Sequence, residues 1–252
     1  MNAPAFNLAG RRALVTGSSQ GIGFALAEAL AAAGAHVVLN GRDEARLAAA
    51  AGQLRATGLA GVTTAAFDVT DEAAVNAGVA ALGAVDILVN NTGIQRRGPL
   101  ETMPLADWET VLKTNLTSAF LVARAVVPGM IARRSGKIIN ICSLMSDLAR
   151  PTTAPYASAK GGLKMLTRSM CGEWARHNLQ VNGIAPGYIL TELTQPLAAD
   201  PKFDTWIKGR TPAGRWGSVA DLTGACVFLA SPAADFVNGQ ILTIDGGLSA
   251  VI

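Results

Sequence analysis

The sequence predicts a single α/β domain whose doubly wound parallel sheet has seven strands and carries helices on both faces. Short, nearly continuous apolar runs alternate with longer Ala- and Leu-rich stretches along almost the whole chain. Half of the 252 residues are hydrophobic and only 15% are charged, which excludes a disordered protein. No linker, low-complexity tract or internal repeat divides the chain, so we expect one domain over 1–252.

The expected elements follow one another in strand–helix order. The apolar runs that predict strands occupy 13–15, 36–39, 63–67, 86–89, 137–141, 180–184 and 240–244. The helical stretches occupy 25–33, 44–55, 71–82, 108–132 and 156–177. Pro128 is expected to bend or end the fourth helix. The segment 188–218 has no clean period, and we expect it to form a small, mobile substrate-binding lid with short helices.

Composition excludes several classes of protein. The 21 basic and 18 acidic residues leave a net charge of +3, too small to indicate a nucleic-acid or membrane-surface partner. No apolar run reaches ~18 residues, so we expect no membrane span. The three cysteines are widely spaced and indicate small buried side chains in a reducing compartment, which predicts a cytoplasmic protein. Two histidines outside any motif predict no metal site.

A glycine-rich turn follows the first expected strand. Gly17, Gly21 and Gly23 allow a tight turn and leave the N-terminus of the next helix open to a pyrophosphate. The spacing Gly-x3-Gly-x-Gly differs from the commoner dinucleotide fingerprint, and a close-packed strand–helix turn would need similar glycines. Its position after the first strand favours the nucleotide interpretation.

The end of the second strand indicates which nucleotide binds. The chain has Asn40-Gly41-Arg42 where an acidic residue would accept hydrogen bonds from a ribose 2′-hydroxyl. No carboxylate there repels a 2′-phosphate, and Arg42 can pair with it bidentately. We therefore expect NADP, with NAD as the alternative if Arg42 is only a solvated charge that starts the next helix.

Four polar residues are candidates for chemistry. Tyr156 and Lys160 are four residues apart in an expected helix, so they share a face and can form an acid/base couple. Ser143 follows the fifth strand, where its hydroxyl would hold a carbonyl or alcohol oxygen, or else cap a turn. Asn115 lies in the middle of a helix, an unfavourable place for Asn, so its side chain either faces solvent or holds a local break and a water.

Taken in order, these motifs resemble the short-chain dehydrogenase/reductase family, which has a Rossmann-type fold. The resemblance spans almost the whole chain and rests on Thr16-Gly17-x3-Gly21-Ile22-Gly23, Asp68-Val69, Asn90-Asn91-Thr92-Gly93, Asn115, Ser143, Tyr156-x3-Lys160, Pro186-Gly187 with Thr191, Val237-Asn238-Gly239-Gln240 and Asp245-Gly246-Gly247. It implies an oxidoreductase that interconverts a secondary alcohol and a ketone. Thr92 departs from the usual Ala, and Gln20 stands where many NADP-using members have a basic residue.

The resemblance also implies residue roles. Tyr156 would exchange a proton with the substrate oxygen, Lys160 would lower the Tyr156 pKa and bind the nicotinamide ribose, and Ser143 would polarise the substrate oxygen. Asn115 would hold a water that links Lys160 to solvent. The cofactor would contact Tyr156 and Lys160 together with Gly17, Ser19, Gln20, Gly21, Ile22, Gly23, Arg42, Asp68, Val69, Asn90, Gly93, Pro186, Gly187, Ile189 and Thr191.

Within the family the chain most resembles the gluconate 5-dehydrogenases, also called 5-ketogluconate reductases. The segments that carry this resemblance are 40–43, 93–97, 139–143 and 211–217. It implies that D-gluconate and 5-keto-D-gluconate are the substrate pair. Because Arg grips a carboxylate bidentately, Arg96, Arg97 and Arg150 are candidate substrate residues, although each can instead be a surface charge. The aromatic residues of 188–218 would cover the nicotinamide or anchor the lid.

Two other functions stay open at this point. A 3-oxoacyl thioester reductase would use the same catalytic residues and NADPH, and would need a basic face for its acidic carrier protein, which Arg133, Arg134, Arg168 and Arg176 can supply. A cofactor-binding protein without turnover would usually lack a catalytic residue, and all four are present. The resemblance further implies a homotetramer, with 108–132 and 156–177 at one interface and 237–252 at a second.

Overall fold

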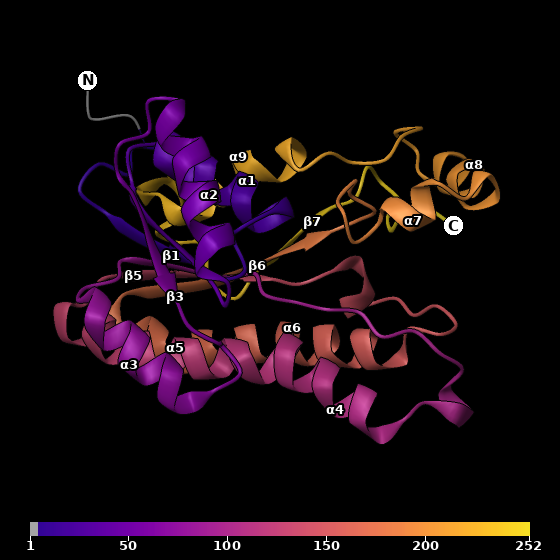
Figure 1. Cartoon of the computed structure of the whole chain (residues 1–252), viewed down its shortest axis with the longest axis horizontal. Helices are drawn as coiled ribbons and strands as arrows, with labels where there is room; N and C mark the ends of the chain where they lie inside the picture. Colours follow the sequence, from indigo (N-terminus) through magenta and orange to yellow (C-terminus); the bar gives the residue numbers. More distant parts are fainter. Residues whose placement is uncertain (1–4) are drawn as a thin grey trace.

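The computed structural model describes residues 5–252 and has one parallel sheet between two helical layers, which confirms the predicted fold (Figure 1). The first four residues of the predicted domain, 1–252, lie outside the described residues. The seven strands are ordered β3-β2-β1-β4-β5-β6-β7, and every neighbouring pair is parallel. The strands are β1 (Arg12–Val15), β2 (His36–Gly41), β3 (Val62–Ala66), β4 (Ile87–Asn90), β5 (Gly136–Ile141), β6 (Leu179–Pro186) and β7 (Ile241–Ile244).

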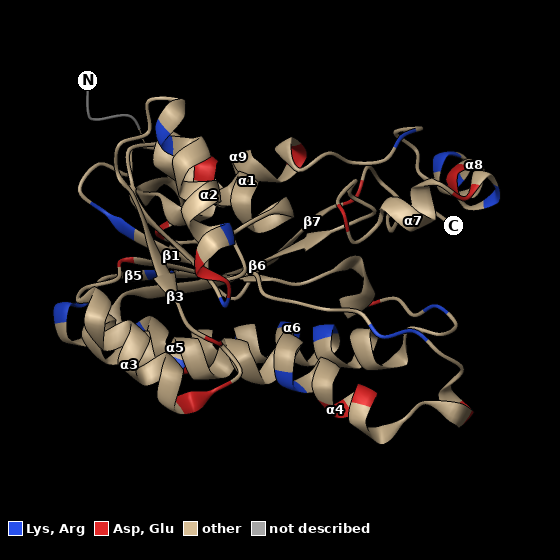
Figure 2. Cartoon of the chain, viewed as in Figure 1, with Lys and Arg blue, Asp and Glu red and all other residues tan. Residues whose placement is uncertain are grey.

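Helices cover both faces because side chains of each strand alternate between two apolar clusters. One face packs against α1 (Gly21–Ala32), α2 (Glu44–Ala56) and α9 (Ala220–Ala230). The other packs against α3 (Glu72–Leu82), α5 (Ser118–Arg133) and α6 (Ala154–Trp174). The remaining helices are α4 (Leu105–Leu112), which leads into α5, and α7 (Gln195–Ala198) and α8 (Pro201–Arg210) within 188–218. Figure 2 shows basic and acidic residues interspersed over these elements.

The structure corrects several expected boundaries. Helix α5 continues past Pro128 to Arg133, so this proline does not end the helix. The interruption lies earlier, in a π-helical segment at Lys113–Thr117 between α4 and α5. The sequence predicts no helix over 220–230, because the apolar residues of this segment show no clear amphipathic period. Helix α9 nevertheless forms there and is buried against α1.

One helical stretch bears on the expectation that no segment spans a membrane. The continuous helical stretch Leu105–Arg133 is long and apolar enough to cross a membrane by length and composition, although no uninterrupted apolar run within it is that long. Half of its most apolar window is buried inside the protein, so this stretch is a core helix of the fold.

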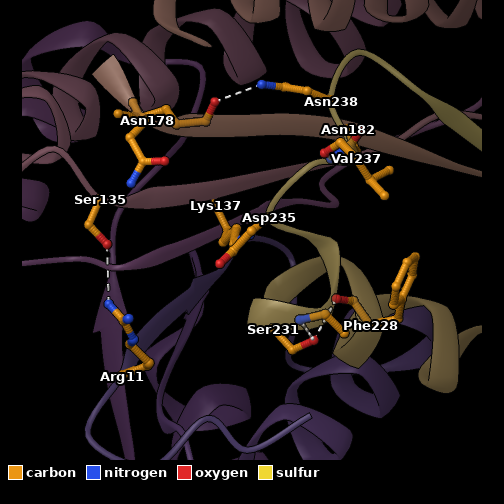
Figure 3. Close-up of polar contacts among 12 residues, drawn as sticks. Arg11, Ser135, Lys137, Asn178, Asn182, Phe228, Ser231, Asp235, Val237 and Asn238 are labelled. Atoms are coloured by element: carbon orange, nitrogen blue, oxygen red, sulfur yellow. Dashed lines mark hydrogen bonds and ion pairs between the residues drawn. The ribbon is translucent and has the colours of Figure 1, made fainter. Parts of the chain in front are cut away.

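The two ends of the sheet differ in their contacts. At the amino-terminal ends of the strands, polar side chains bind one another across elements (Figure 3). Lys137 of β5 donates to Asp235 at 2.6 Å, and Arg11 donates to Ser135 at 3.3 Å. A surface hollow of about 640 Å³ opens at this edge, but its one carboxylate, Asp86, already accepts a hydrogen bond from the backbone of β1. The reactive residues lie at the opposite, carboxyl-terminal edge, where the order of strands reverses between β1 and β4.

Candidate active site

The glycine-rich turn joins β1 to α1 as the sequence predicted. Gly17 and Gly21 adopt φ of +59° and +60°, a region that favours glycine. A Cβ on Gly23 would lie 2.5 Å from the Gly17 carbonyl oxygen, so only glycine allows this close approach. No side chain caps the start of α1, which leaves its first N–H groups available to an anion. The turn therefore has the features that a pyrophosphate requires.

The end of β2 carries a buried amide and an exposed cation. Asn40 is 1% exposed and donates to the carbonyl oxygens of Ala65 and Phe67, so its side chain ties β2 to β3. The Arg42 side chain is 80% exposed and lies 3.8 Å from the Asp68 carboxylate. Burial opposes ionisation of Asp68, but hydrogen bonds from Thr70 and the nearby Arg42 charge hold its pKa below the usual value. Arg42 therefore already has a carboxylate partner in Asp68, while most of its side chain stays exposed.

Asn115 lies in the π-helical segment, and its side chain is 1% exposed. Its Oδ1 accepts from the Ile94 N–H at 2.8 Å, and its Nδ2 donates to the Ile94 carbonyl at 2.9 Å. Of the two sequence alternatives, the local break is therefore correct and the solvent-facing side chain is wrong. The two hydrogen bonds between Asn115 and Ile94 hold the segment after β4. Gly93 in this segment lies close to both functional side chains, because a Cβ added there would lie 3.6 Å from Asn115 Oδ1 and 3.7 Å from Lys160 Nζ.

Ser143 follows β5 and begins the short 3-10 turn Leu144–Ser146. Its Oγ accepts a hydrogen bond from the Met145 N–H at 3.1 Å, and Ser146 Oγ in turn accepts from the Ser143 N–H. The capping role that was one alternative is therefore present. It leaves the hydroxyl proton of Ser143 free to donate, so capping and binding of a substrate oxygen are compatible.

Tyr156 and Lys160 lie on the first two turns of α6, and Lys160 is 3% exposed. The Lys160 ammonium donates to the Ile141 carbonyl at 2.5 Å and lies 5.7 Å from the centre of the Tyr156 ring. Burial lowers the Lys160 pKa to about 8. Burial raises the pKa of the Tyr156 phenol, while the neighbouring Ser143 side chain acts in the opposite direction. This direction is the reverse of the expected one: desolvation is the largest cause, and the neighbouring Cys142 and Tyr188 side chains also raise the Tyr156 pKa.

Several predicted cofactor residues turn out to shape the backbone. The Asn90 side chain points into the sheet and donates to Asn140, so it does not face the groove. A Cβ on Gly187 would lie 2.7 Å from the Asp245 Cα, which explains the glycine at the end of β6. The Thr191 N–H donates to Thr194 Oγ1 at 2.9 Å, which holds the start of 188–218 in a tight turn.

Two contacts of the 188–218 segment escaped the sequence analysis. Gln20 of the glycine turn donates to Glu192 at 2.7 Å, although 172 residues separate them. Tyr188 accepts a hydrogen bond from Arg150 at 3.2 Å and packs edge-on against Trp216, with ring centres 5.7 Å apart. The aromatic residues of this segment contact one another, which favours the anchoring role over a cover for the nicotinamide. No local sequence signal identifies Glu192, because its partner is so distant in the chain.

The three candidate arginines separate into two groups. Arg97 and Arg150 lie near each other: burial and the Arg150 charge both lower the Arg97 pKa. Arg150 also stacks on Phe203, with its guanidinium carbon 4.8 Å from the ring centre. Arg96 instead pairs with Asp107 of α4 at 3.5 Å and is exposed. The structure thus brings two of the three beside Tyr188 and pairs the third with α4.

Comparisons with known proteins agree with this geometry. Residues 17–249 match the family described as Enoyl-(Acyl carrier protein) reductase. The chain is 54% identical to a gluconate 5-dehydrogenase of Gluconobacter oxydans, over 97% of this chain and 96% of that protein. It is 49% identical to the 5-keto-D-gluconate 5-reductase of Escherichia coli K12, over 98% of each. A crystal structure of a gluconate 5-dehydrogenase from Burkholderia cenocepacia with NADP and tartrate superposes with a TM-score of 0.95, at 54% identity and 98% coverage of both chains.

Proposed function

The chain belongs to the short-chain dehydrogenase/reductase family of oxidoreductases, and on this premise we propose that it interconverts D-gluconate and 5-keto-D-gluconate with NADP(H). The observation that carries the proposal is a pair of neighbouring guanidiniums, Arg97 and Arg150, beside Tyr188. Tyr188 in turn lies close enough to Tyr156 to contribute to the raised pKa of its phenol. A molecule that carries a ketone or secondary alcohol and, several carbons away, a carboxylate is the kind of substrate that this arrangement fits.

The carboxyl edge fits the pyrophosphate and adenosine of NADP. The uncapped start of α1 and the close approach at Gly23 suit the pyrophosphate, and the exposed Arg42 suits the 2′-phosphate. Gln20 donates to Glu192, so the discrimination between NADP and NAD rests on Arg42. When bound, the cofactor supplies the hydride.

Tyr156 would move the proton. With its pKa raised by burial, the phenol stays protonated at neutral pH and can donate to a ketone oxygen held by the Ser143 hydroxyl. Oxidation of the alcohol needs the phenolate, so its rate should rise with pH while reduction proceeds near neutrality. Lys160, with a pKa of about 8, would support the phenolate and bind the ribose hydroxyls.

The substrate carboxylate would bind between Arg97 and Arg150. The Tyr188 hydroxyl and the Phe203 ring hold the Arg150 guanidinium in place, so less side-chain entropy is lost on binding. Arg96 is removed from the proposed substrate residues because it pairs with Asp107. The segment 188–218 supplies Tyr188 and Phe203, and we propose that it acts as the substrate lid.

The alternative of a carrier-protein-dependent 3-oxoacyl reductase receives less support. Arg133 donates to the Val85 carbonyl and lies near Asp86, and Arg134 donates to the Arg176 carbonyl. Arg133 is the last residue of α5 and Arg134 follows it, before β5, so both lie at the amino-terminal edge of the sheet, opposite Tyr156. A thioester tethered to a carrier bound there would have to span the sheet.

We further propose a cytoplasmic homotetramer. Exposed apolar side chains on the predicted interfaces support assembly: Phe120 of α5, Met165 of α6, and Val251 and Ile252 at the C-terminus. Free thiols at all three cysteines are compatible with a reducing compartment. Sedimentation analysis tests the assembly directly, and a monomer at micromolar concentration would contradict it.

The decisive experiment measures NADPH oxidation with 5-keto-D-gluconate, with NADH in parallel. Rapid loss of NADPH absorbance with much slower loss of NADH is the expected result. Turnover of a β-keto thioester, with none of 5-keto-D-gluconate, would overturn the substrate assignment in favour of the acyl reductase. Tyr156→Phe is the control that shows whether turnover takes place at this site. The variant should be nearly inactive, and full activity would show that the reaction takes place elsewhere.

A further inference from the structure

A chain of buried hydrogen bonds between side chains crosses from the sheet to α6. Asn90 Nδ2 donates to Asn140 Oδ1 at 2.9 Å, and Asn140 Nδ2 donates to Thr167 Oγ1 at 2.8 Å. Thr167 Oγ1 then donates to the Leu163 carbonyl within α6 at 2.8 Å. Asn140 and Thr167 are both fully buried, and Asn90 is 5% exposed. The chain thus links β4, β5 and α6 in the interior.

This chain lies next to the candidate reacting groups. Thr167 follows Lys160 by seven residues, two helical turns, so it lies on the α6 face that also carries Tyr156 and Lys160. Asn140 immediately precedes Ile141, whose carbonyl accepts from Lys160, and lies three residues before Ser143. Helix α6 is therefore attached to β5 at two adjacent strand positions, directly below the site.

Two polar contacts hold the start of α6: the Lys160 ammonium donates to the Ile141 carbonyl, and Ser146 Oγ donates to the Lys160 carbonyl at 2.9 Å. The Asn140–Thr167 bond is the polar contact that holds the helix two turns further along. On this face the residues around the chain are apolar and include Leu163, Leu166 and Ala119. Apolar packing is non-directional and tolerates small shifts, whereas a hydrogen bond has a narrow range of distance and angle. A buried amide without a partner is costly, so each partner of the Asn140–Thr167 bond holds the other in one arrangement.

We propose that Asn140 and Thr167 are positioning residues that fix the depth and rotation of α6, and so the placement of Tyr156 and Lys160 relative to Ser143. The inference rests on the proposed roles of those three residues. Asn140 and Thr167 contact no reacting atom themselves; they act through the helix. Figure 1 shows α6 lying along the face of the sheet, so a shift of this helix moves both Tyr156 and Lys160 together.

The test is Thr167→Val, which keeps the shape of the side chain but removes the hydroxyl. We expect kcat for 5-keto-D-gluconate to fall about 10-fold or more, because a displacement near 1 Å can cost ~100-fold in rate. The KM for NADPH should change less than kcat, because Tyr156 and Lys160 are the only proposed cofactor residues that lie on α6. Thr167→Ser keeps the donor and acceptor and should restore kcat.

A second measurement does not depend on the substrate. The protein has two tyrosines, so the titration of Tyr156 is the difference between the phenolate absorbance of the parent and of Tyr156→Phe. Burial raises the Tyr156 pKa in the parent, and a displaced helix should move this titration in Thr167→Val. If no variant and no parent reduces 5-keto-D-gluconate, the proposed function fails while this titration still decides the positioning role.

Ser169→Ala is the matched control. Ser169 makes the same kind of bond, to the Met165 carbonyl at 3.1 Å, on the exposed side of α6, and its removal should change neither readout. An unchanged kcat and Tyr156 titration in Thr167→Val would overturn the proposal, even if the melting temperature fell. Failure of Thr167→Ser to restore kcat would overturn it as well, because the hydroxyl would then not be the determinant.

Discussion

Two lysines on opposite edges of the same sheet, Lys137 partly buried and Lys160 buried, have different partners. Lys137 at the amino-terminal edge donates to Asp235, and this carboxylate opposes the lowering of the Lys137 pKa by burial. Lys160 at the carboxyl-terminal edge has no carboxylate partner among the described residues, and burial lowers its pKa to about 8. The first lysine is paired within the fold, whereas the second is held by one carbonyl and retains donors for a ligand.

The arginines repeat this contrast. Arg133 lies near Asp86 at the amino-terminal edge, whereas at the other edge Arg97 lies near a second cation, Arg150, whose charge lowers the Arg97 pKa. Like charges placed together without an acid destabilise the protein, so they indicate a site for an anion. The comparison teaches that charge without an acidic partner, more than pocket size, separates the functional edge from the structural one.

The largest expected effect comes from removing the Tyr156 hydroxyl. Tyr156→Phe should lower kcat/KM about 1,000-fold, within the range for loss of a general acid. NADPH affinity, measured by fluorescence of the bound nucleotide, should change little. Loss of NADPH binding instead would show that the hydroxyl organises the groove and would weaken the contrast between the edges.

The lysine comparison is tested by the pair Lys160→Met and Lys137→Met. Lys160→Met should lower kcat about 100-fold and yet raise the free energy of unfolding at pH 7 by on the order of 2 kcal/mol. The sign follows from linkage: the unfolded lysine binds more protons between pH 8 and 10.5, so the parent gains stability as pH rises through this window and carries the full penalty below it. Lys137→Met should leave kcat unchanged.

Denaturant titrations at pH 7 and pH 10 measure this effect. The difference in the free energy of unfolding between Lys160→Met and the parent should be smaller at pH 10, where Lys160 of the parent is largely neutral. Lys137→Met should alter stability by less than about 1 kcal/mol, because its partner Asp235 is mostly exposed. An equal loss of activity in both variants would remove the distinction between the two edges.

Arg150→Gln tests the proposed anion site. It should raise the KM for 5-keto-D-gluconate about 30-fold through loss of a charge-assisted hydrogen bond, with a smaller effect on kcat. A neutral ketone should show no such change. Arg96→Gln is the matched control, since Arg96 pairs with Asp107, and comparable effects in both variants would argue for a general charge effect.

Arg42→Ala should have the smallest effect. We expect a roughly 10-fold weaker Kd for NADPH and little change for NADH, because the exposed guanidinium would contact only the 2′-phosphate. Isothermal titration with both nucleotides measures the ratio. If the affinity for NADH falls to the same degree, the role of Arg42 is to hold Asp68 and not to select the cofactor.

Much of the site followed from local patterns. The glycine turn, the end of β2 and the four-residue spacing of Tyr156 and Lys160 each depend on neighbours in sequence, so the pattern predicted their placement at the carboxyl edge. Asn115 was left between two alternatives, because whether a mid-helix Asn is exposed depends on the element packed over it. The π-helical segment and the backbone of Ile94 decided that it is buried.

The direction of the Tyr156 pKa could not be predicted from the sequence. The spacing to Lys160 suggested attraction, but the sign depends on burial, which the whole fold determines. Likewise the sequence offered three arginines without distinguishing them. Asp107 of α4 pairs with Arg96, and the loop before α6 brings Arg150 to Arg97.

By itself the sequence determined the α/β class, the number of strands and their succession along the chain, and the edge of the sheet at which the motifs gather, because hydrophobic periodicity and turn residues act over short stretches. Only the tertiary structure decided which distant side chains meet: Gln20 with Glu192, and Asn140 with Thr167. Such contacts depend on how helices pack against the sheet. Packing is a property of the assembled core, so no local pattern encodes it.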